Sequence, residues 1–268
     1  MSSKPSLSIT LLRAYLKFYF QTRRFLIVFV IYLILSLLGP ILIAVGVVQK
    51  QPSVYDFTGS ALGSLSSAIV LACAILAGDA VSQDFSRQGL FTLTQPISRA
   101  RILLARYLAA FIASAGVFIL SYYLVVAVAG YLFYGQFIPN ILEVAAMGLL
   151  LTASMVAFVM LFSSLVKNPA VSVLLSVIVV LIGMGVISGI AEVTNVEPWF
   201  LLTYAGGAVS DLALQTYPQH VQPVGVPGFN FNVYTPYVSE AIEIMVAYLL
   251  ISIALAYLVY SRRELRET

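Results

Sequence analysis

The side chains that could do chemistry are sparse in this sequence of 268 residues, and most of them gather in residues 79–106. Asp84 and Arg87 are three positions apart, so one helical turn would bring their charges to the same side. Phe85 and Phe91 stand beside them and offer apolar surface. Charges with neighbouring aromatic rings can dock a partner protein, or they can form a simple ion pair on a solvated loop. Neither interpretation makes this segment a catalytic centre.

Signatures of catalysis and of nucleotide binding are absent from the sequence. There is no G-x-x-x-x-G-K-[ST] phosphate loop and no H-E-x-x-H metal motif. The single histidine, His220, argues against a His-rich metal site and a Ser-His-Asp triad. The single cysteine, Cys73, excludes an internal disulfide and a cysteine cluster. We therefore expect no catalytic residue, metal or cofactor in this chain, so any energy must come from a partner or an ion gradient.

The elements that carry these side chains are expected to be transmembrane helices. The chain is 61% hydrophobic and 9% charged, a balance that a soluble domain of this length would not tolerate. A bilayer core requires about 20 apolar residues in a helix. Runs of suitable length cover residues 25–48, 61–78, 107–134, 145–166, 170–191 and 244–260. The predicted fold is an all-α polytopic membrane protein, a single transmembrane domain over residues 1–268.

Lys and Arg side chains set the expected orientation of these spans. Only Lys50 falls on one side of the membrane. The other side holds Lys4, Arg13, Lys17, Arg23, Arg24, Arg87, Arg99, Arg101, Arg106, Lys167, Arg262, Arg263 and Arg266. The basic side should be cytoplasmic, which predicts a multi-pass plasma-membrane protein with both termini in the cytoplasm. The first apolar run and the segment before it are too long for a cleavable signal peptide.

Residues 7–24 are expected to form an amphipathic helix on the inner membrane face, in contact with lipid. Arg13, Lys17, Gln21 and Arg24 recur at helical spacing and would share one face. The alternative is a positively charged flank that only fixes the topology. The periodicity favours the helix because it persists for several turns.

The long connection 192–238 on the expected outer side has no Lys or Arg and is rich in proline and aromatic residues. Its apolar stretch PWFLLTYAGGAV is too short to span a bilayer. It is therefore either a re-entrant or interfacial helix or part of an ordinary outer loop. Glu143, Glu240 and Glu243 lie at the outer starts of predicted spans, where the helix dipole favours carboxylates.

Two small-residue motifs within the spans have a structural and a functional interpretation. Gly39 and Pro40 should bend the first span, either as a fixed kink or as the hinge of a gate. Gly185 and Gly189 form a G-x-x-x-G motif that suits close helix packing within the chain or contact with a second copy. The spans hold almost no acidic residues, which argues against a proton- or sodium-coupled transporter and against an intramembrane enzyme.

The segment ILAGDAVSQDFSRQGLFTLTQPISRARILLARYLAA resembles the cytoplasmic loop of type-2 ABC transporter permeases. The matching positions are Asp84, Gly89, Leu90, Leu93, Pro96, Ile97, Ser98, Arg99 and the basic Arg106 that opens the third span. The ending from Tyr260 to Glu264 is similar to the family's aromatic-x-Arg-Arg-acidic terminus, and the six-span layout also agrees. The sequence departs from the family at Leu90, where threonine is common, at Gln83-Asp84, where Glu-Arg is frequent, and at Arg106, where lysine is usual.

The resemblance implies the membrane subunit of an ATP-driven exporter. Residues 79–106 would contain a coupling helix that docks on a separate ATPase subunit, and a short turn would make a second contact. The implied docking residues are Asp84, Phe85, Arg87, Gly89, Leu93, Gln95, Pro96 and Arg99, with Lys167, Asn168 and Pro169 as the second contact. Two ATPase subunits would hold ATP and Mg, and a second permease copy or a sister permease would complete the assembly, without nucleic acid. The apolar composition suits a hydrophobic substrate. The alternative is a membrane scaffold that docks a partner without transport.

Overall fold

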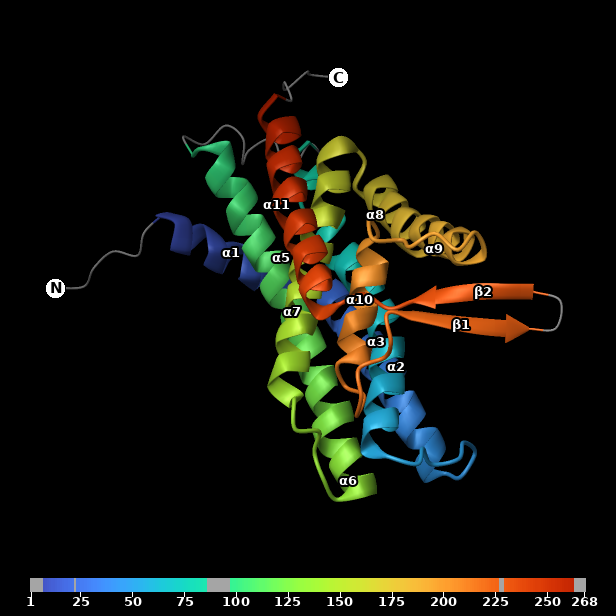
Figure 1. Cartoon of the computed structure of the whole chain (residues 1–268). Coiled ribbons are helices and arrows are strands. Elements are labelled where there is room, and N and C mark those ends of the chain that lie inside the picture. Colours follow the sequence, from blue (N-terminus) through green and yellow to red (C-terminus); the bar gives the residue numbers. More distant parts are fainter. Residues whose placement is uncertain (1–6, 22, 86–96, 227–228, 263–268) are drawn as a thin grey trace.

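The computed structural model describes residues 7–21, 23–85, 97–226 and 229–262. Helices dominate these ranges, joined by one two-stranded sheet (Figure 1). In chain order the elements are α1 Leu7–Gln21, α2 Arg23–Ala44, α3 Val54–Ala77, η1 Ser82–Phe85, α5 Arg99–Tyr122, η2 Tyr123–Ala129, α6 Gly130–Tyr134, α7 Ile141–Leu165, α8 Pro169–Val177, η3 Ile178–Gly183, α9 Met184–Val193, α10 Leu202–Asp211, β1 Val221–Val226, β2 Phe229–Tyr234 and α11 Val238–Arg262.

Six helical segments are long and apolar enough to cross a membrane, as the sequence predicts. They run over Phe25–Ala44, Val54–Phe85, Arg99–Tyr134, Ile141–Leu165, Pro169–Val193 and Val238–Arg262. The first helix ends at Ala44 rather than at residue 48, and the second begins at Val54 rather than at residue 61. Ser53 explains the earlier start, because its side chain accepts a hydrogen bond from the Asp56 amide at 3.1 Å and caps the helix.

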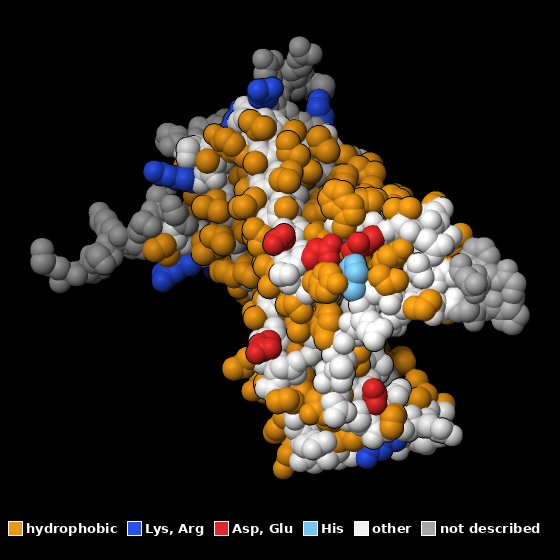
Figure 2. Space-filling model, in the orientation of Figure 1, with side chains coloured by type: hydrophobic (Ala, Val, Ile, Leu, Met, Phe, Trp, Pro, Cys, Tyr) orange, Lys and Arg blue, Asp and Glu red, His pale blue; other side chains and the backbone are white. Residues whose placement is uncertain are grey.

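The centre of the bundle is formed by α3 and α7, whose side chains are mostly buried. Helices α5, α10 and α11 pack around them, whereas α2 and the α8–α9 segment lie at the periphery and expose most of their apolar side chains. Apolar side chains accordingly cover much of the face seen in Figure 2. That exposure is expected where lipid, rather than water, surrounds the helices.

Glycine brings the helices together, but not at the predicted motif. A Cβ added at Gly148 of α7 would lie 2.1 Å from the Phe118 ring of α5, so those helices approach closely only because that side chain is absent. Gly185 and Gly189 have no atom within 4 Å of such a Cβ. Close packing inside the chain is therefore the wrong interpretation for this G-x-x-x-G motif. Pro40 lies inside α2, which continues for another turn beyond it.

The long connection contains both helix and sheet. The short apolar stretch of residues 198–209 yields α10, whose buried face packs against α3, α7 and α11. After it, β1 and β2 form an antiparallel hairpin in the register Val221↔Tyr234. The fold is predominantly helical, as predicted, but the sequence prediction did not include this short hairpin, although valine and aromatic residues alternate with polar ones in FNFNVY, a pattern typical of a strand.

Candidate functional site: a buried polar cluster at the basic end

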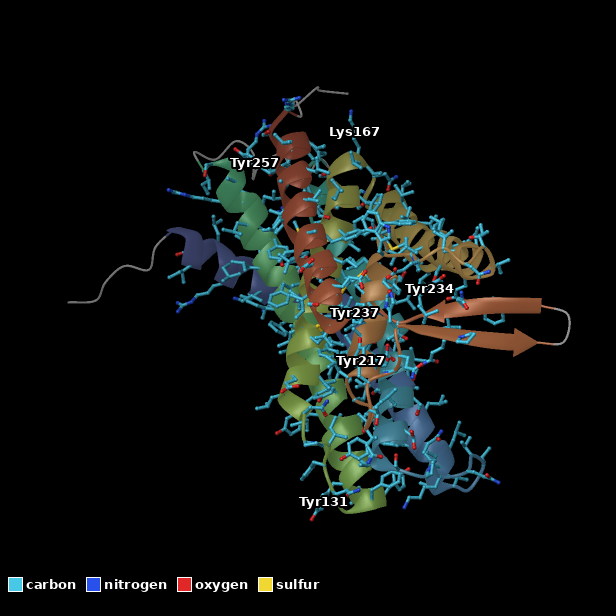
Figure 3. All side chains as sticks on the ribbon, viewed as in Figure 1. Tyr131, Lys167, Tyr217, Tyr234, Tyr237 and Tyr257 are labelled. Carbon is cyan, nitrogen blue, oxygen red and sulfur yellow. The ribbon has the colours of Figure 1, made fainter. Side chains whose placement is uncertain are left out.

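We call the end of the bundle that holds Arg101, Lys167 and Arg262 the basic end; Lys167 is labelled there in Figure 3. The predicted docking residues Arg87, Gly89, Leu93, Gln95 and Pro96 lie outside the described residues. The remaining three stand on either side of that segment. Asp84 and Phe85 lie in η1, and Arg99 is the first residue of α5.

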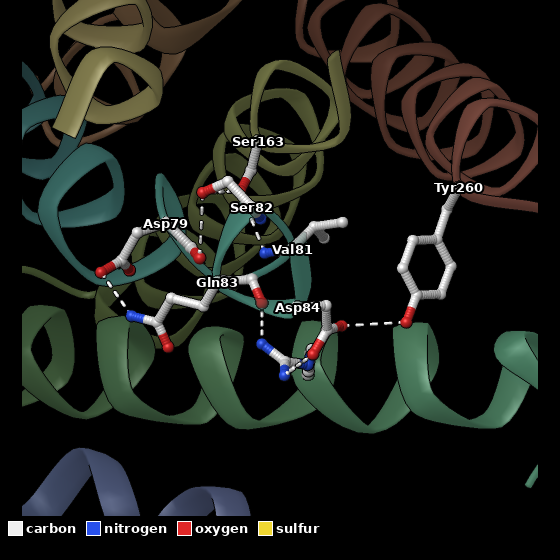
Figure 4. Close-up of polar contacts among 9 residues, drawn as sticks. Asp79, Val81, Ser82, Gln83, Asp84, Ser163 and Tyr260 are labelled. Carbon is white, nitrogen blue, oxygen red and sulfur yellow. Dashed lines mark hydrogen bonds and ion pairs between the residues drawn. The ribbon is translucent and has the colours of Figure 1, made fainter. Parts of the chain in front are cut away.

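Asp84 has no exposed surface, and its carboxylate is bound from two sides (Figure 4). Oδ1 forms an ion pair with the Arg106 guanidinium of α5. Oδ2 accepts a hydrogen bond of 2.9 Å from the Tyr260 hydroxyl of α11. A buried carboxylate is costly unless it is paired and hydrogen-bonded, and both conditions are met here.

Arg106 connects this pair to two further segments. Its guanidinium donates to the Ala80 carbonyl between α3 and η1. The same group lies 4.8 Å from the centre of the Tyr15 ring, so α1 contributes a cation–π contact. Tyr15 falls in the segment predicted to be interfacial, and α1 packs against α5 along its length. Four elements, α1, η1, α5 and α11, therefore meet at one ion pair.

Ser163 of α7 attaches the chain between α3 and η1 to the centre of the bundle. Its hydroxyl oxygen accepts hydrogen bonds from the amides of Val81 at 3.0 Å and Ser82 at 3.1 Å. Asp79 accepts a bond of 2.6 Å from the Gln83 side chain (Figure 4). The two bonds to Ser163 satisfy amides at the start of η1, where the first N–H groups of a helical turn have no partner within it. The position of Asp84 is thus fixed by the backbone segment that precedes it as well as by the partners of its side chain.

Arg99 ties the start of α5 to the end of α11. Its guanidinium donates to the carbonyls of Tyr260 and Ser261, both at 2.9 Å. Carbonyls in the last turn of a helix lack partners within it, and a cation is favourable there. Helix α5 begins at Arg99, and the Ser98 side chain that precedes it makes no capping bond.

The burial of Asp84 changes one part of the docking prediction. We expected its carboxylate to form ion pairs at a surface, but it has none exposed and is engaged inside the chain. Phe85 is half-buried, with its ring 5.9 Å from that of Tyr260 in an edge-to-face contact. Asp84 is therefore not proposed again as a direct contact for a partner.

The second predicted contact, Lys167, Asn168 and Pro169, is held by helix capping. Asn168 Oδ1 accepts hydrogen bonds from the Ala170 amide at 2.9 Å and the Val171 amide at 3.4 Å. Pro169 occupies the first turn of α8, where the missing N–H of proline is tolerated. Lys167 and Asn168 are exposed, so the turn presents polar groups at the basic end.

A groove of about 490 Å³ lies between α3, α7, the η3–α9 segment and α10. Gly185 and Gly189 form part of its wall, together with Ser66, Glu192 and Tyr204. The glycines are therefore open to this space. The wall mixes apolar side chains with a few hydroxyls and one carboxylate.

Acidic side chains also gather away from the basic end. Asp211, at the end of α10, is mostly buried, and burial raises its pKa to about 6. Burial and the nearby Asp211 carboxylate raise the pKa of Tyr217 to about 12. Glu197 and Glu240 meet at His220, a grouping that the sequence analysis missed because these residues are far apart along the chain.

Comparison with known proteins leaves the family open. No family model matches the chain, and no curated protein matches it.

Proposed function

We propose that this chain is the permease subunit of an ATP-driven exporter of the type-2 ABC class. In this proposal two partner ATPase subunits bind ATP and Mg, and this chain catalyses no covalent step. It resides in the plasma membrane with both termini in the cytoplasm, beside a second copy or a sister permease. ATP binding draws the ATPases together, the helices shift, and a hydrophobic substrate leaves on the outer side.

The observation that carries the proposal is the convergence of three residues on which the family resemblance rests. Asp84, Arg106 and Tyr260 come from separate parts of the sequence and meet in one buried cluster. Arg99, from the Pro-Ile-Ser-Arg run, binds the end of the same helix as Tyr260. The motif residues thus share one structural task, which is to join helices at the basic end.

Such a cluster suits the transmission of force from an ATPase. Residues 86–96 connect η1 directly to the start of α5. A partner pressing on that segment would act on both of its ends, and the ion pair holds those ends to α1 and α11. The helices would then move together, because a packed interface shifts between discrete arrangements rather than deforming gradually.

Docking can be tested with a charge reversal in the proposed coupling segment. We would co-express the chain with candidate ATPases encoded near its gene, purify through a tag on the permease, and compare Arg87→Glu with Arg101→Glu. Arg101 is an exposed arginine at the basic end but lies on α5, outside the proposed contact. We expect Arg87→Glu to lose the ATPase and Arg101→Glu to retain it. Equal retention by both variants would refute docking on this segment.

Coupling can be tested separately from docking. Asp84→Asn leaves the surface unchanged because Asp84 is buried, but it removes the charge that holds Arg106. We expect this variant to bind the ATPase normally and to stimulate ATP hydrolysis less than the parent in proteoliposomes. If the parent chain binds the ATPase but never transports a hydrophobic dye or lipid, it is instead the non-transporting scaffold of the alternative hypothesis.

A further inference from the structure

Three side chains with metal-binding atoms converge at the base of the hairpin. Glu197 follows α9, His220 immediately precedes β1, and Glu240 lies in the first turn of α11. One ligand atom from each lies within 4.8 Å of the other two, and His220 Nε2 is 3.5 Å from Glu197 Oε2. Figure 2 shows the histidine next to acidic side chains on an open face of the molecule.

The hydrogen bond of the other imidazole nitrogen determines which atom is available. His220 Nδ1 lies 2.7 Å from the Thr235 carbonyl oxygen. A carbonyl oxygen only accepts, so Nδ1 must carry the hydrogen. In the neutral ring, Nε2 then carries no hydrogen, and its lone pair faces Glu197. This arrangement, with one nitrogen donating to a carbonyl and the other free, is the usual one for metal-bound histidine.

Each of the two carboxylates is also held in place through one of its own oxygens. Glu197 Oε1 accepts a bond of 2.9 Å from the Tyr204 hydroxyl, which leaves Oε2 facing the histidine. Glu240 Oε2 accepts a bond of 3.3 Å from the Tyr237 amide, and the Glu240 carboxyl lies within hydrogen-bonding reach of the Glu197 side chain, so a bound cation would relieve the repulsion between the two acids. The ring of Tyr237 stacks on His220 at 4.4 Å and limits its rotation. Each potential ligand is therefore oriented by a second partner, as ligands of metal sites commonly are.

The charges of this group are not balanced by the chain. Residues 192–238 contain no Lys or Arg, and in the described ranges neither carboxylate forms an ion pair with a Lys or Arg side chain, while the neutral His220 ring adds a lone pair and no positive charge. Two carboxylates and a lone pair repel one another unless a cation stands between them. Zinc-to-ligand distances of about 2.0–2.2 Å in a tetrahedral site place the ligand atoms about 3.4 Å apart. The 3.5 Å between His220 Nε2 and Glu197 Oε2 already matches this spacing, and side-chain rotation of Glu240 would close the remaining separations, which are no more than 4.8 Å.

We propose that Glu197, His220 and Glu240 bind a divalent first-row transition metal such as Zn²⁺. One nitrogen and two oxygen donors suit zinc, whereas Mg²⁺ and Ca²⁺ prefer oxygen alone. The metal ties the segment after α9 and the base of the hairpin to the first turn of α11. It thereby closes the long connection next to the groove, whose wall includes Tyr204. This site is independent of the proposed transport function.

The test measures Zn²⁺ binding by the purified full-length chain in detergent after treatment with EDTA. Isothermal titration would give the stoichiometry and affinity, and Co²⁺ substitution would report coordination through its visible absorption. Wild type should bind one Zn²⁺. Glu240→Gln and His220→Gln should bind more than about 100-fold more weakly, and Tyr204→Phe about 10-fold more weakly through loss of its bond to Glu197. Size-exclusion profiles confirm that each variant is folded.

Glu243→Gln is the matched control, because Glu243 is exposed and lies one turn further along the same helix. It should bind Zn²⁺ as wild type does. The proposal is overturned if wild type fails to bind Zn²⁺, or if Glu240→Gln binds as tightly as Glu243→Gln. In either case the three side chains would form a cluster that holds no metal.

Discussion

Two clusters of ionisable side chains differ in how their negative charge is compensated. The Asp84 cluster is fully buried, and its carboxylate is matched by Arg106 from the same chain. The cluster of Glu197, His220 and Glu240 is half-exposed and contains two carboxylates without a Lys or Arg partner in the described ranges. The negative charge of the first cluster is compensated within the chain, whereas that of the second could be compensated by a cation from solution.

Because of this difference, the two clusters should respond differently to mutation and to the ions in solution. A buried ion pair contributes little net stability, but loss of one partner is strongly destabilising because a charge is left without compensation. We therefore expect that changing one member of the Asp84 cluster also weakens the contacts made by the other members. The exposed cluster can gain and lose its cation, so it should respond to the composition of the solution.

The largest effect is expected for Arg106→Met, which leaves Asp84 buried without its cation. We expect a loss of about 3–5 kcal/mol in unfolding free energy. Thermal unfolding in detergent would measure it as a large drop in Tm. The double variant Asp84→Asn with Arg106→Met removes both charges and should recover part of the loss. Additive losses in the double variant would contradict a coupled pair.

Tyr260→Phe should have a smaller effect, because the Asp84–Arg106 pair remains. The change removes one hydrogen bond to a charged group, a bond worth about 1.5–3 kcal/mol. The half-buried Tyr248→Phe is a suitable control, because its hydroxyl donates to a neutral carbonyl, that of Phe200. Chemical denaturation of the two variants should show the larger loss for Tyr260→Phe. Equal losses would mean that the charge of Asp84 contributes nothing to this bond.

Asp211 is another acid that forms no ion pair within the described residues, and burial raises its pKa to about 6. An acid with a raised pKa in the folded state binds protons more readily there than when unfolded. Stability due to Asp211 is therefore fully present below about pH 4 and is lost progressively as the pH rises to about 6 and above. Asp211→Asn should raise stability at pH 8 by about 1 kcal/mol, allowing for its partial exposure, and should change little below about pH 4. A gain that is the same at both pH values would exclude this cause.

The sequence was sufficient to predict the helices and insufficient to predict how their polar residues pair. Apolar runs of the required length set the six spans, because hydrophobicity is local information. Asp84 and Tyr260 are far apart in sequence, so their hydrogen bond could be found only in three dimensions. The alternation in FNFNVY is a local signal from which β2 could have been predicted. The grouping at His220 could not, because a lone histidine becomes a ligand only with carboxylates brought from elsewhere in the chain.

The smallest effect is the most direct test of the comparison between the two clusters. In EDTA, Glu240→Gln removes one of two neighbouring carboxylates and should raise stability slightly, by about 0.5 kcal/mol, whereas Asp84→Asn should lower it. Glutamine keeps an oxygen that can accept from the Tyr237 amide, so the backbone contact survives. With Zn²⁺ in excess the order reverses, because wild type gains binding energy that the variant lacks. Tm values of wild type, Glu240→Gln and Glu243→Gln, each with EDTA and with Zn²⁺, would decide it. If Glu240→Gln is destabilised equally in both conditions, the carboxylates are balanced within the chain after all, and the two clusters do not differ in kind.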